Sequence, residues 1–141
     1  MNAQSLAVSS FLLLGFVASA TPCICVATSL REELKKADAI FVGEVVSFRS
    51  SGSGSTLSSV ARIKVSRYWK GTDRPEQIDV LTDGFDGSDC GPVLAKGTYL
   101  VYAYKKGQWL ATWACTRTRR IEEAAEDLKM LGPGQPPTKS K

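Results

Sequence analysis

The four cysteines of this chain constrain its fold more than any other feature of the sequence. They are Cys23, Cys25, Cys90 and Cys115, and the sequence contains no others. An even number of cysteines in a short exported chain is typical of a disulfide framework. A bridge between Cys23 and Cys25 is disfavoured, because residues two positions apart in an extended segment do not easily reach disulfide geometry. Two pairings remain open, and each ties the start of the domain to two distant parts of the chain.

Two such bridges would supply much of the stability of a domain this small. With 141 residues, of which 43% are hydrophobic, the chain is expected to form one globular domain with a modest core. In the chain-entropy model, each long-range bridge adds about 4 kcal/mol to the free energy of unfolding. A zinc site made of four cysteines is the alternative. It is disfavoured because such sites usually need two Cys-x-x-Cys pairs, and this chain has none.

The first twenty residues have the pattern of a secretory signal peptide. They carry no charged side chain, and the apolar run Phe11–Val17 is followed by the small residues Ala18-Ser19-Ala20. An N-terminal helix of the fold is the alternative, since the segment before the run lacks Lys and Arg. We expect residues 1–20 to be removed on export, which places the protein in the periplasm or outside the cell. The run is too short to span a bilayer, so we expect no stable membrane insertion.

Hydrophobic periodicity predicts a mainly β domain with a short helix near each end. Residues 28–36 predict the first helix, which Ser29 and Glu32 begin as a capping box. Alternating or apolar runs predict five strands, at residues 39–49, 57–69, 77–82, 98–104 and 108–116, with a turn at 105–107. Gly43 within the first strand indicates a bulge or bend.

The order of these elements favours a small closed barrel. Long, bent strands predict a five-stranded Greek-key barrel of the oligonucleotide/oligosaccharide-binding (OB) type. Apolar residues from Ile121 to Leu131 recur at helical spacing and predict a closing helix. We therefore expect one domain over residues 21–131, with two disulfides. The Pro- and Gly-rich residues 132–141 predict a disordered tail.

The sequence lacks the side chains that most catalytic sites need. Histidine is absent, which excludes Ser-His-Asp and Cys-His catalysis and removes the commonest metal ligand. Acidic residues are present, but nothing places two of them at catalytic separation in a cleft. Asp83, Asp86 and Asp89 lie in a Gly-rich loop that lacks the spacing of a calcium-binding EF-hand, so a plain turn is favoured. We expect a protein that is not an enzyme and that carries no cofactor.

The net charge of +4 is too small to indicate nucleic-acid binding by itself. Arg62, Lys64 and Tyr68 share the second strand, and cations mixed with aromatic rings can stack nucleic-acid bases on an OB barrel. In an exported chain a solvated sheet face is the better interpretation. The basic run Arg117–Arg120 is likewise interpreted as a solvated connector. We expect a monomer that does not bind nucleic acid.

Several short motifs accompany the cysteines. They are Ala37–Gly43 (ADAIFVG), Trp69-Lys70-Gly71, Cys90-Gly91, Tyr99–Ala103 (YLVYA) and Cys115–Thr118 (CTRT). Together with the early Cys-x-Cys, this pattern resembles the N-terminal domain of the tissue inhibitors of metalloproteinases and the related netrin-like modules. The resemblance extends from Cys23 to about Leu131, and the cysteine spacing is its most specific part.

The resemblance implies an OB-fold barrel with bridges Cys23–Cys90 and Cys25–Cys115, and it implies a function. The partner would be a zinc metalloproteinase, whose catalytic zinc would be chelated by the α-amino nitrogen and carbonyl oxygen of Cys23. Ile24 would enter the specificity pocket beside that zinc. Val26 and the loop residues Asp89, Cys90 and Gly91 would line the cleft. The chain would be a secreted inhibitor of zinc metalloendopeptidases.

This chain departs from the family pattern in ways that keep a second function open. It lacks the further bridge and the second cysteine-rich domain of the metazoan members, so we expect a minimal, single-domain relative. Cleavage after Ala20 leaves Thr21 and Pro22 ahead of Cys23, whose nitrogen would then be an amide and could not chelate zinc. The alternative function is therefore a netrin-like protein-binding module that does not inhibit.

Overall fold

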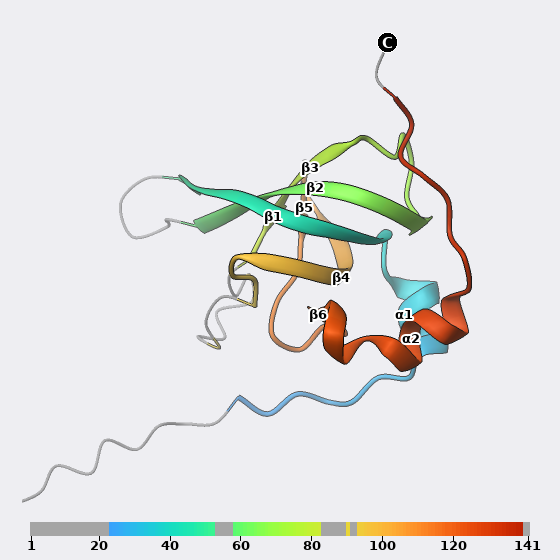
Figure 1. Cartoon of the computed structure of the whole chain (residues 1–141). Coiled ribbons are helices and arrows are strands. Elements are labelled where there is room, and N and C mark those ends of the chain that lie inside the picture. The colour runs from blue at the N-terminus through green and yellow to red at the C-terminus, as the bar shows by residue number, and fades with distance from the viewer. Residues whose placement is uncertain (1–22, 53–57, 83–89, 91–92, 140–141) are drawn as a thin grey trace, which may run out of the picture.

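Five strands of this chain pair side by side until the sheet closes into a ring (Figure 1). β1 pairs with β2 and β4, β2 with β3, β3 with β5, and β5 with β4. Every pair is antiparallel except β3 with β5, which is parallel. The strands of the ring are β1 (Ala39–Ser51), β2 (Ser58–Lys70), β3 (Gln77–Leu81), β4 (Gly97–Lys106) and β5 (Trp109–Ala111).

The structure, a computed structural model, describes residues 23–52, 58–82, 90 and 93–139. The expected signal peptide, residues 1–20, lies outside them, as do Asp89 and Gly91. Within the described residues the expectation of a mainly β domain with a helix near each end is confirmed. A short sixth strand, β6 (Arg119–Arg120), flanks β4 outside the ring. No helix in the described part of the chain is long and apolar enough to cross a membrane.

The first helix begins where the sequence predicts. Ser29 is the N-cap of α1 (Leu30–Lys36), and it forms the expected capping box with Glu32. The Ser29 backbone N–H donates to Glu32 Oε2 at 2.9 Å, and the Glu32 N–H donates to Ser29 Oγ at 3.3 Å. Lys70 Nζ donates to the carbonyl oxygens of Leu34 and Lys35. These contacts fix α1 to the end of β2.

The main core fills the inside of the ring. Phe41 and Tyr68 meet there with ring centroids 5.5 Å apart, and the Tyr68 hydroxyl donates to the Pro75 carbonyl oxygen at 2.8 Å. Burial raises the pKa of Tyr68 to about 12. The buried residues of this cluster come from four strands and the segment before β4: Ala39, Phe41, Val45, Ala61, Ile63, Val65, Tyr68, Val80, Leu94, Tyr99, Val101 and Ala103.

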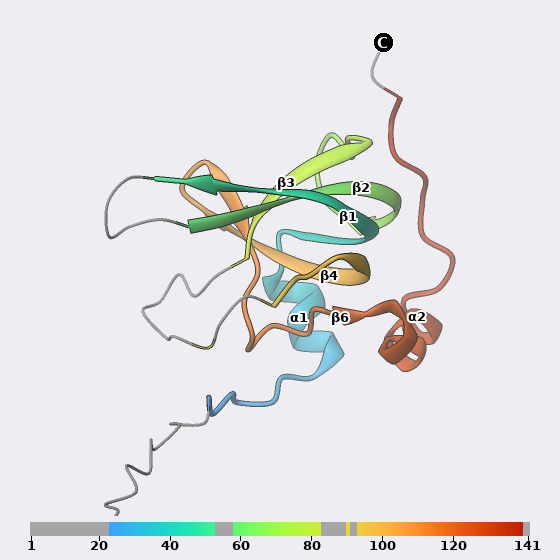
Figure 2. The same ribbon diagram turned by 60° about the vertical axis from the view of Figure 1, so that its left-hand side comes forward.

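A second core lies on the outer face of β1 and β4, beneath the helices (Figure 2). Successive residues of β1 pack alternately into the main core and the second core, so the strand is buried on both faces along its first half. The buried members of this cluster are Leu30, Ala37, Ile40, Val42, Leu100, Tyr102 and Ala124. The helices therefore form a layer that packs on one side of the ring.

The expected glycine irregularity in β1 is present. The pairing of β1 with β2 shifts register between Val42 and Gly43. A Cβ atom at Gly43 would lie 2.5 Å from Ile63 Cγ2 and 2.8 Å from the Lys64 carbonyl oxygen. Only glycine tolerates so close an approach of the two strands. The bulge bends β1, which pairs with β2 on one edge and with β4 on the other.

The closing helix differs from the continuous helix that the periodicity predicts. Residues Ile121–Glu123 form a 3-10 turn, and α2 (Ala125–Leu131) follows as a separate helix. Ala124 lies between them with φ −99° and ψ 9°, outside helical geometry, and no side chain caps either piece. The apolar spacing survives the break, since Ile121, Ala124 and Leu128 all pack on the second core.

The last strand of the ring is shorter than predicted. β5 ends at Ala111, and the chain then leaves the sheet through a turn at residues 113–116. The Thr112 hydroxyl lies 2.9 Å from the Thr116 hydroxyl and 2.7 Å from that of Thr118. These contacts fold the turn back on itself, and the turn carries Cys115.

The residues after α2 pass the end of β2 and pair with it at Tyr68, whereas their composition predicts disorder (Figure 1). Gln135 and Tyr68 exchange two backbone hydrogen bonds, both 2.8 Å long. The Trp69 indole donates to the Gly132 carbonyl oxygen at 3.0 Å, and the Thr138 N–H donates to the Arg74 carbonyl oxygen at 2.8 Å. β3 pairs only with Val60–Lys64 of β2, so the tail takes the edge that β3 leaves open.

Candidate interaction segment at the first two cysteines

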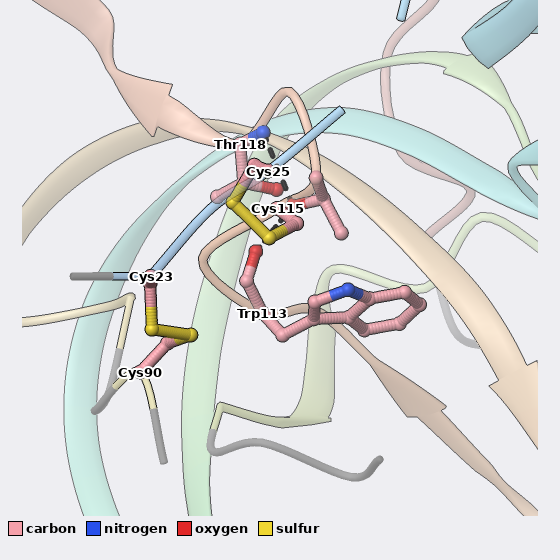
Figure 3. Close-up of a disulfide and its surroundings, with 7 residues drawn as sticks. Cys23, Cys25, Cys90, Trp113, Cys115 and Thr118 are labelled. Carbon is pink, nitrogen blue, oxygen red and sulfur yellow. Dashed lines mark hydrogen bonds between the residues drawn. A yellow bond between two sulfur atoms is a disulfide. The ribbon is translucent and has the colours of Figure 1, made fainter. Parts of the chain in front are cut away.

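Two disulfides fasten the start of the described chain to two separate loops (Figure 3). Cys23 is bonded to Cys90, with their Cα atoms 5.7 Å apart, and Cys25 is bonded to Cys115, with their Cα atoms 5.1 Å apart. The pairing implied by the family resemblance is confirmed. The alternative zinc site is excluded, because all four cysteine sulfurs are in bridges. Disulfides of this kind fit an oxidising compartment.

The segment between the bridges is extended, and its apolar side chains face solvent. It runs from Cys23 towards α1 as an extended trace (Figures 1 and 2). Successive side chains of an extended segment point to opposite sides, so the two cysteines share one side and Ile24 and Val26 share the other. Ile24 is 90% exposed and Val26 is 84% exposed. They are the two most exposed large hydrophobic residues in the described part of the chain.

This exposure has an energetic consequence. Full burial of an aliphatic side chain of this size contributes about 1.5–3 kcal/mol. Single exposed apolar side chains are common, but here two neighbours are exposed on a segment that disulfides hold in place. Because the bridges restrict the segment before any partner binds, little conformational entropy remains to be lost on binding. The segment therefore presents a preformed apolar ridge, which we call the Cys23–Val26 ridge.

An ion pair anchors the far end of this segment to the core. Arg117 Nη1 donates to the Thr28 carbonyl oxygen at 2.9 Å, and Arg117 Nε donates to Asp127 Oδ2 at 3.0 Å. The Asp127 side chain is only 2% exposed, and it also accepts a hydrogen bond of 2.8 Å from the Tyr102 hydroxyl. Tyr102 belongs to the second core. The position of Thr28 thus depends on a buried carboxylate of α2.

The electrostatics of this anchor keep Asp127 ionised. Burial by itself raises the pKa of the Asp127 carboxyl, but hydrogen bonds from Arg117 and Tyr102 outweigh burial and hold that pKa below its usual value. Burial and the neighbouring carboxylate raise the pKa of Tyr102. The carboxylate and the guanidinium are therefore both charged at neutral pH, and the anchor keeps its full strength there.

Asp127→Asn should destabilise the protein by about 1–3 kcal/mol at pH 7, because Arg117 and Tyr102 lose their charged partner. The folded-state pKa of Asp127 lies below its unfolded value of about 3.9, so the contribution is present above pH of about 4 and is lost as the pH falls through the folded-state pKa. Urea unfolding at pH 7, 4 and 3 measures this. The exposed neighbour Glu126→Gln is the control, and a difference between Asp127→Asn and wild type that is independent of pH would contradict the expectation.

A second set of contacts positions the same end of the segment. The Thr28 hydroxyl donates to Glu33 Oε1 at 2.5 Å, and the Tyr104 hydroxyl donates to Glu33 Oε2. Glu33 is buried although it belongs to the first turn of α1. The ring of Tyr104 packs on Trp113 with centroids 5.1 Å apart, and Trp113 begins the turn that carries Cys115 (Figure 3). Helix α1, strand β4 and the Cys115 turn therefore meet behind the ridge.

The structure brings together most of the residues that the sequence predicts for the site. Cys23, Ile24, Cys25 and Val26 form the ridge, and Cys90 lies against its first residue. Asp89 and Gly91 lie outside the described residues, so their placement stays a prediction. The sequence interpretation missed Arg117 and Asp127, because an Arg in a basic run and an Asp in an acidic helix turn both resemble solvated residues.

Possible metal ligands do not cluster in the described part of the chain. Nowhere in residues 23–52, 58–82, 90 and 93–139 do three His, Cys, Asp or Glu side chains gather closely enough to hold a metal ion. The arrangement offers a partner backbone groups and two aliphatic side chains. No family model matches the chain, and no curated protein matches it.

Proposed function

We propose that this protein is a secreted inhibitor of zinc metalloendopeptidases and that the Cys23–Val26 ridge enters the cleft of the target enzyme. The observation that carries the proposal is the ridge itself, an extended segment held by two disulfides with Ile24 and Val26 turned to solvent. Proteinase clefts bind extended chains, so a preformed extended segment suits them. In this proposal the chain acts by binding and not by catalysis.

Zinc chemistry explains how such a segment would block an enzyme. A catalytic zinc ion keeps an open position that water occupies. When Cys23 is the first residue, its α-amino nitrogen and carbonyl oxygen form a bidentate ligand that displaces this water. The bridge from Cys23 to Cys90 holds both atoms in place, which lowers the entropy cost of binding.

The fold is consistent with the proposed family. We propose that the ring of five strands is an OB-fold barrel. Supporting this are the ring order β1-β2-β3-β5-β4, the parallel β3–β5 pair and the bulge at Gly43. The ends of the ring give the chain two sets of loops, and both Cys90 and Cys115 lie outside its strands. The ridge is therefore attached to the periphery of the ring, where a partner has access to it.

Ile24→Gly should weaken inhibition by about 1.5–3 kcal/mol in binding free energy, since the variant loses the apolar burial of one aliphatic side chain in the specificity pocket. The experiment is an inhibition assay of a protein that begins at Cys23 against one broad-specificity zinc endopeptidase. Met130→Ala serves as the matched control, because Met130 is 66% exposed on α2. Equal loss in both variants, or no loss in Ile24→Gly, would contradict the proposed role of Ile24.

A second candidate function is a netrin-like protein-binding module that does not inhibit. The sequence before the ridge favours it, because the small residues Ala18-Ser19-Ala20 place the expected cleavage site two residues ahead of Cys23. The nitrogen of Cys23 would then be an amide, which is not a useful zinc ligand. N-terminal sequencing of the exported protein separates the two functions, since the first requires Cys23 at the terminus.

A further inference from the structure

A shallow pocket of about 220 Å³ opens beside Val26. Val26 and Thr28 line it from the ridge side, and the Cys25–Cys115 bridge and Thr116 line it from the turn. Two arginines, Arg117 and Arg119, also line it. The pocket therefore adjoins the Cys23–Val26 ridge at Val26.

Arg117 and Arg119 differ in how many hydrogen-bond partners their guanidinium groups already have within the protein. Arg117 donates to both carboxylate oxygens of Asp127 and to the Thr28 carbonyl oxygen, so its charge is compensated inside the protein. Arg119 donates through Nε to the Arg117 carbonyl oxygen at 3.2 Å. It forms no ion pair with a carboxylate among the residues that the structure describes. Its positive charge helps to lower the pKa of the nearby Asp127 carboxyl, but among the described residues its two terminal nitrogens have no carboxylate in hydrogen-bonding contact.

We infer that this pocket binds a carboxylate on an acidic side chain, Asp or Glu, of the protein that covers the ridge. The inference rests on the proposed function, because it assumes a protein partner at the Cys23–Val26 ridge. The planar guanidinium group matches a carboxylate through two parallel hydrogen bonds. Covering the pocket without such a partner would leave Arg119 desolvated and unpaired, which is unfavourable.

The neighbours of Arg119 favour an acidic side chain flanked by apolar groups over a free small anion. Val26 lines the same pocket and is 84% exposed, and Ile24 continues the apolar ridge. A ligand that fills the site must satisfy one cation and cover two aliphatic side chains. A peptide with a central Glu between aliphatic residues meets both requirements, and its Gln counterpart meets only the second.

The test uses the peptides acetyl-Leu-Glu-Leu-amide and acetyl-Leu-Gln-Leu-amide, titrated into the ¹⁵N-labelled protein and followed by NMR. We expect the Glu peptide to bind more tightly and to shift the backbone amides of Ala27, Thr116 and Arg119. Arg119→Ala should weaken binding of the Glu peptide about two- to fivefold, the range of an accessible ion pair, and should leave the Gln peptide unaffected. Thermal unfolding of each variant confirms that it is folded.

Arg120→Ala is the matched control, since Arg120 is the next residue but its guanidinium lies over the Tyr99 ring, 5.4 Å from the centroid. Equal binding of the two peptides, no binding of either, or equal losses in both variants would overturn the carboxylate pocket. The inhibition assay separates this outcome from failure of the proposed function. If the protein does not inhibit yet the Glu peptide binds through Arg119, the pocket stands and the zinc-proteinase partner is wrong.

Discussion

Replacing Cys25 and Cys115 together with alanine should lower the free energy of unfolding by about 2–5 kcal/mol. The bridge joins residues 90 positions apart, so its removal frees a long loop in the unfolded chain. The same change releases the centre of the ridge from the turn that follows β5. The ring should still fold, because its core is built from strands that contain neither cysteine. Urea unfolding followed by fluorescence measures the effect.

The matched control leaves the bridge intact and changes a residue beside it. Ala114 lies on the same turn and is exposed. The Ala114→Ser variant should change the free energy of unfolding by less than about 0.5 kcal/mol. If the double alanine variant unfolds at the same denaturant concentration as the wild type, the bridge contributes nothing to stability. A loss of all secondary structure would show instead that the ring depends on the bridge.

Blocking the amine of Cys23 should reduce inhibition by about a hundredfold or more. Acetylation, or one added residue ahead of Cys23, converts the α-amine into an amide and removes one zinc ligand of the proposed pair. Mutation of a residue that only hydrogen-bonds to a metal ligand already lowers metal affinity by about 10–100-fold. Loss of a direct ligand should therefore cost at least as much. Inhibition of one zinc endopeptidase by the blocked and unblocked forms measures the ratio.

The pH dependence of inhibition gives an independent check on the same mechanism. Zinc binds the unprotonated amine, and an α-amine has an unperturbed pKa of about 7.7–8.0. Inhibition by the form that begins at Cys23 should therefore weaken as the pH falls below that range. Equal inhibition by the forms that begin at Thr21 and at Cys23 would exclude chelation by the terminal amine. If no form inhibits, the binding-module function becomes the better one.

The parts of the fold that depend on local patterns could be predicted from the sequence. The capping box of Ser29 and Glu32 marks the start of α1 because its hydrogen bonds join residues three positions apart. Gly43 indicates the bulge because a glycine inside a strand leaves room for a close neighbour. The strand boundaries agree within about two residues, except in β5.

The parts that depend on distant partners could not be predicted in the same way. The strand predicted at 108–116 is apolar enough to continue, but the chain leaves the sheet at Thr112 because hydroxyl contacts with Thr116 and Thr118 form a turn. Composition predicts disorder for residues 132–141. Gln135 is nevertheless ordered by Tyr68, which lies 67 positions earlier.

The candidate site was predictable where it depends on the cysteines and not where it depends on charges. The family resemblance carried by the cysteine spacing implied Ile24 and Val26, and the alternation of an extended segment places both on the side opposite the bridges. Arg117 and Asp127 become visible only in three dimensions, because the burial of Asp127 depends on the packing of α2 against Tyr102. The charge of Arg119 stays accessible because Asp127 forms its ion pair with Arg117.

The residues that follow α2 also cover a strand edge that would otherwise be open. An open strand edge offers unpaired backbone groups to any neighbouring chain and can template its addition. The last residues of β2 would form such an edge, but Gln135 pairs with them at Tyr68. Pro133, Pro136 and Pro137 have no backbone N–H, so the covering segment offers few donors to a further strand. Among the described residues, a proline-rich sequence thus covers the edge of β2 that β3 leaves unpaired.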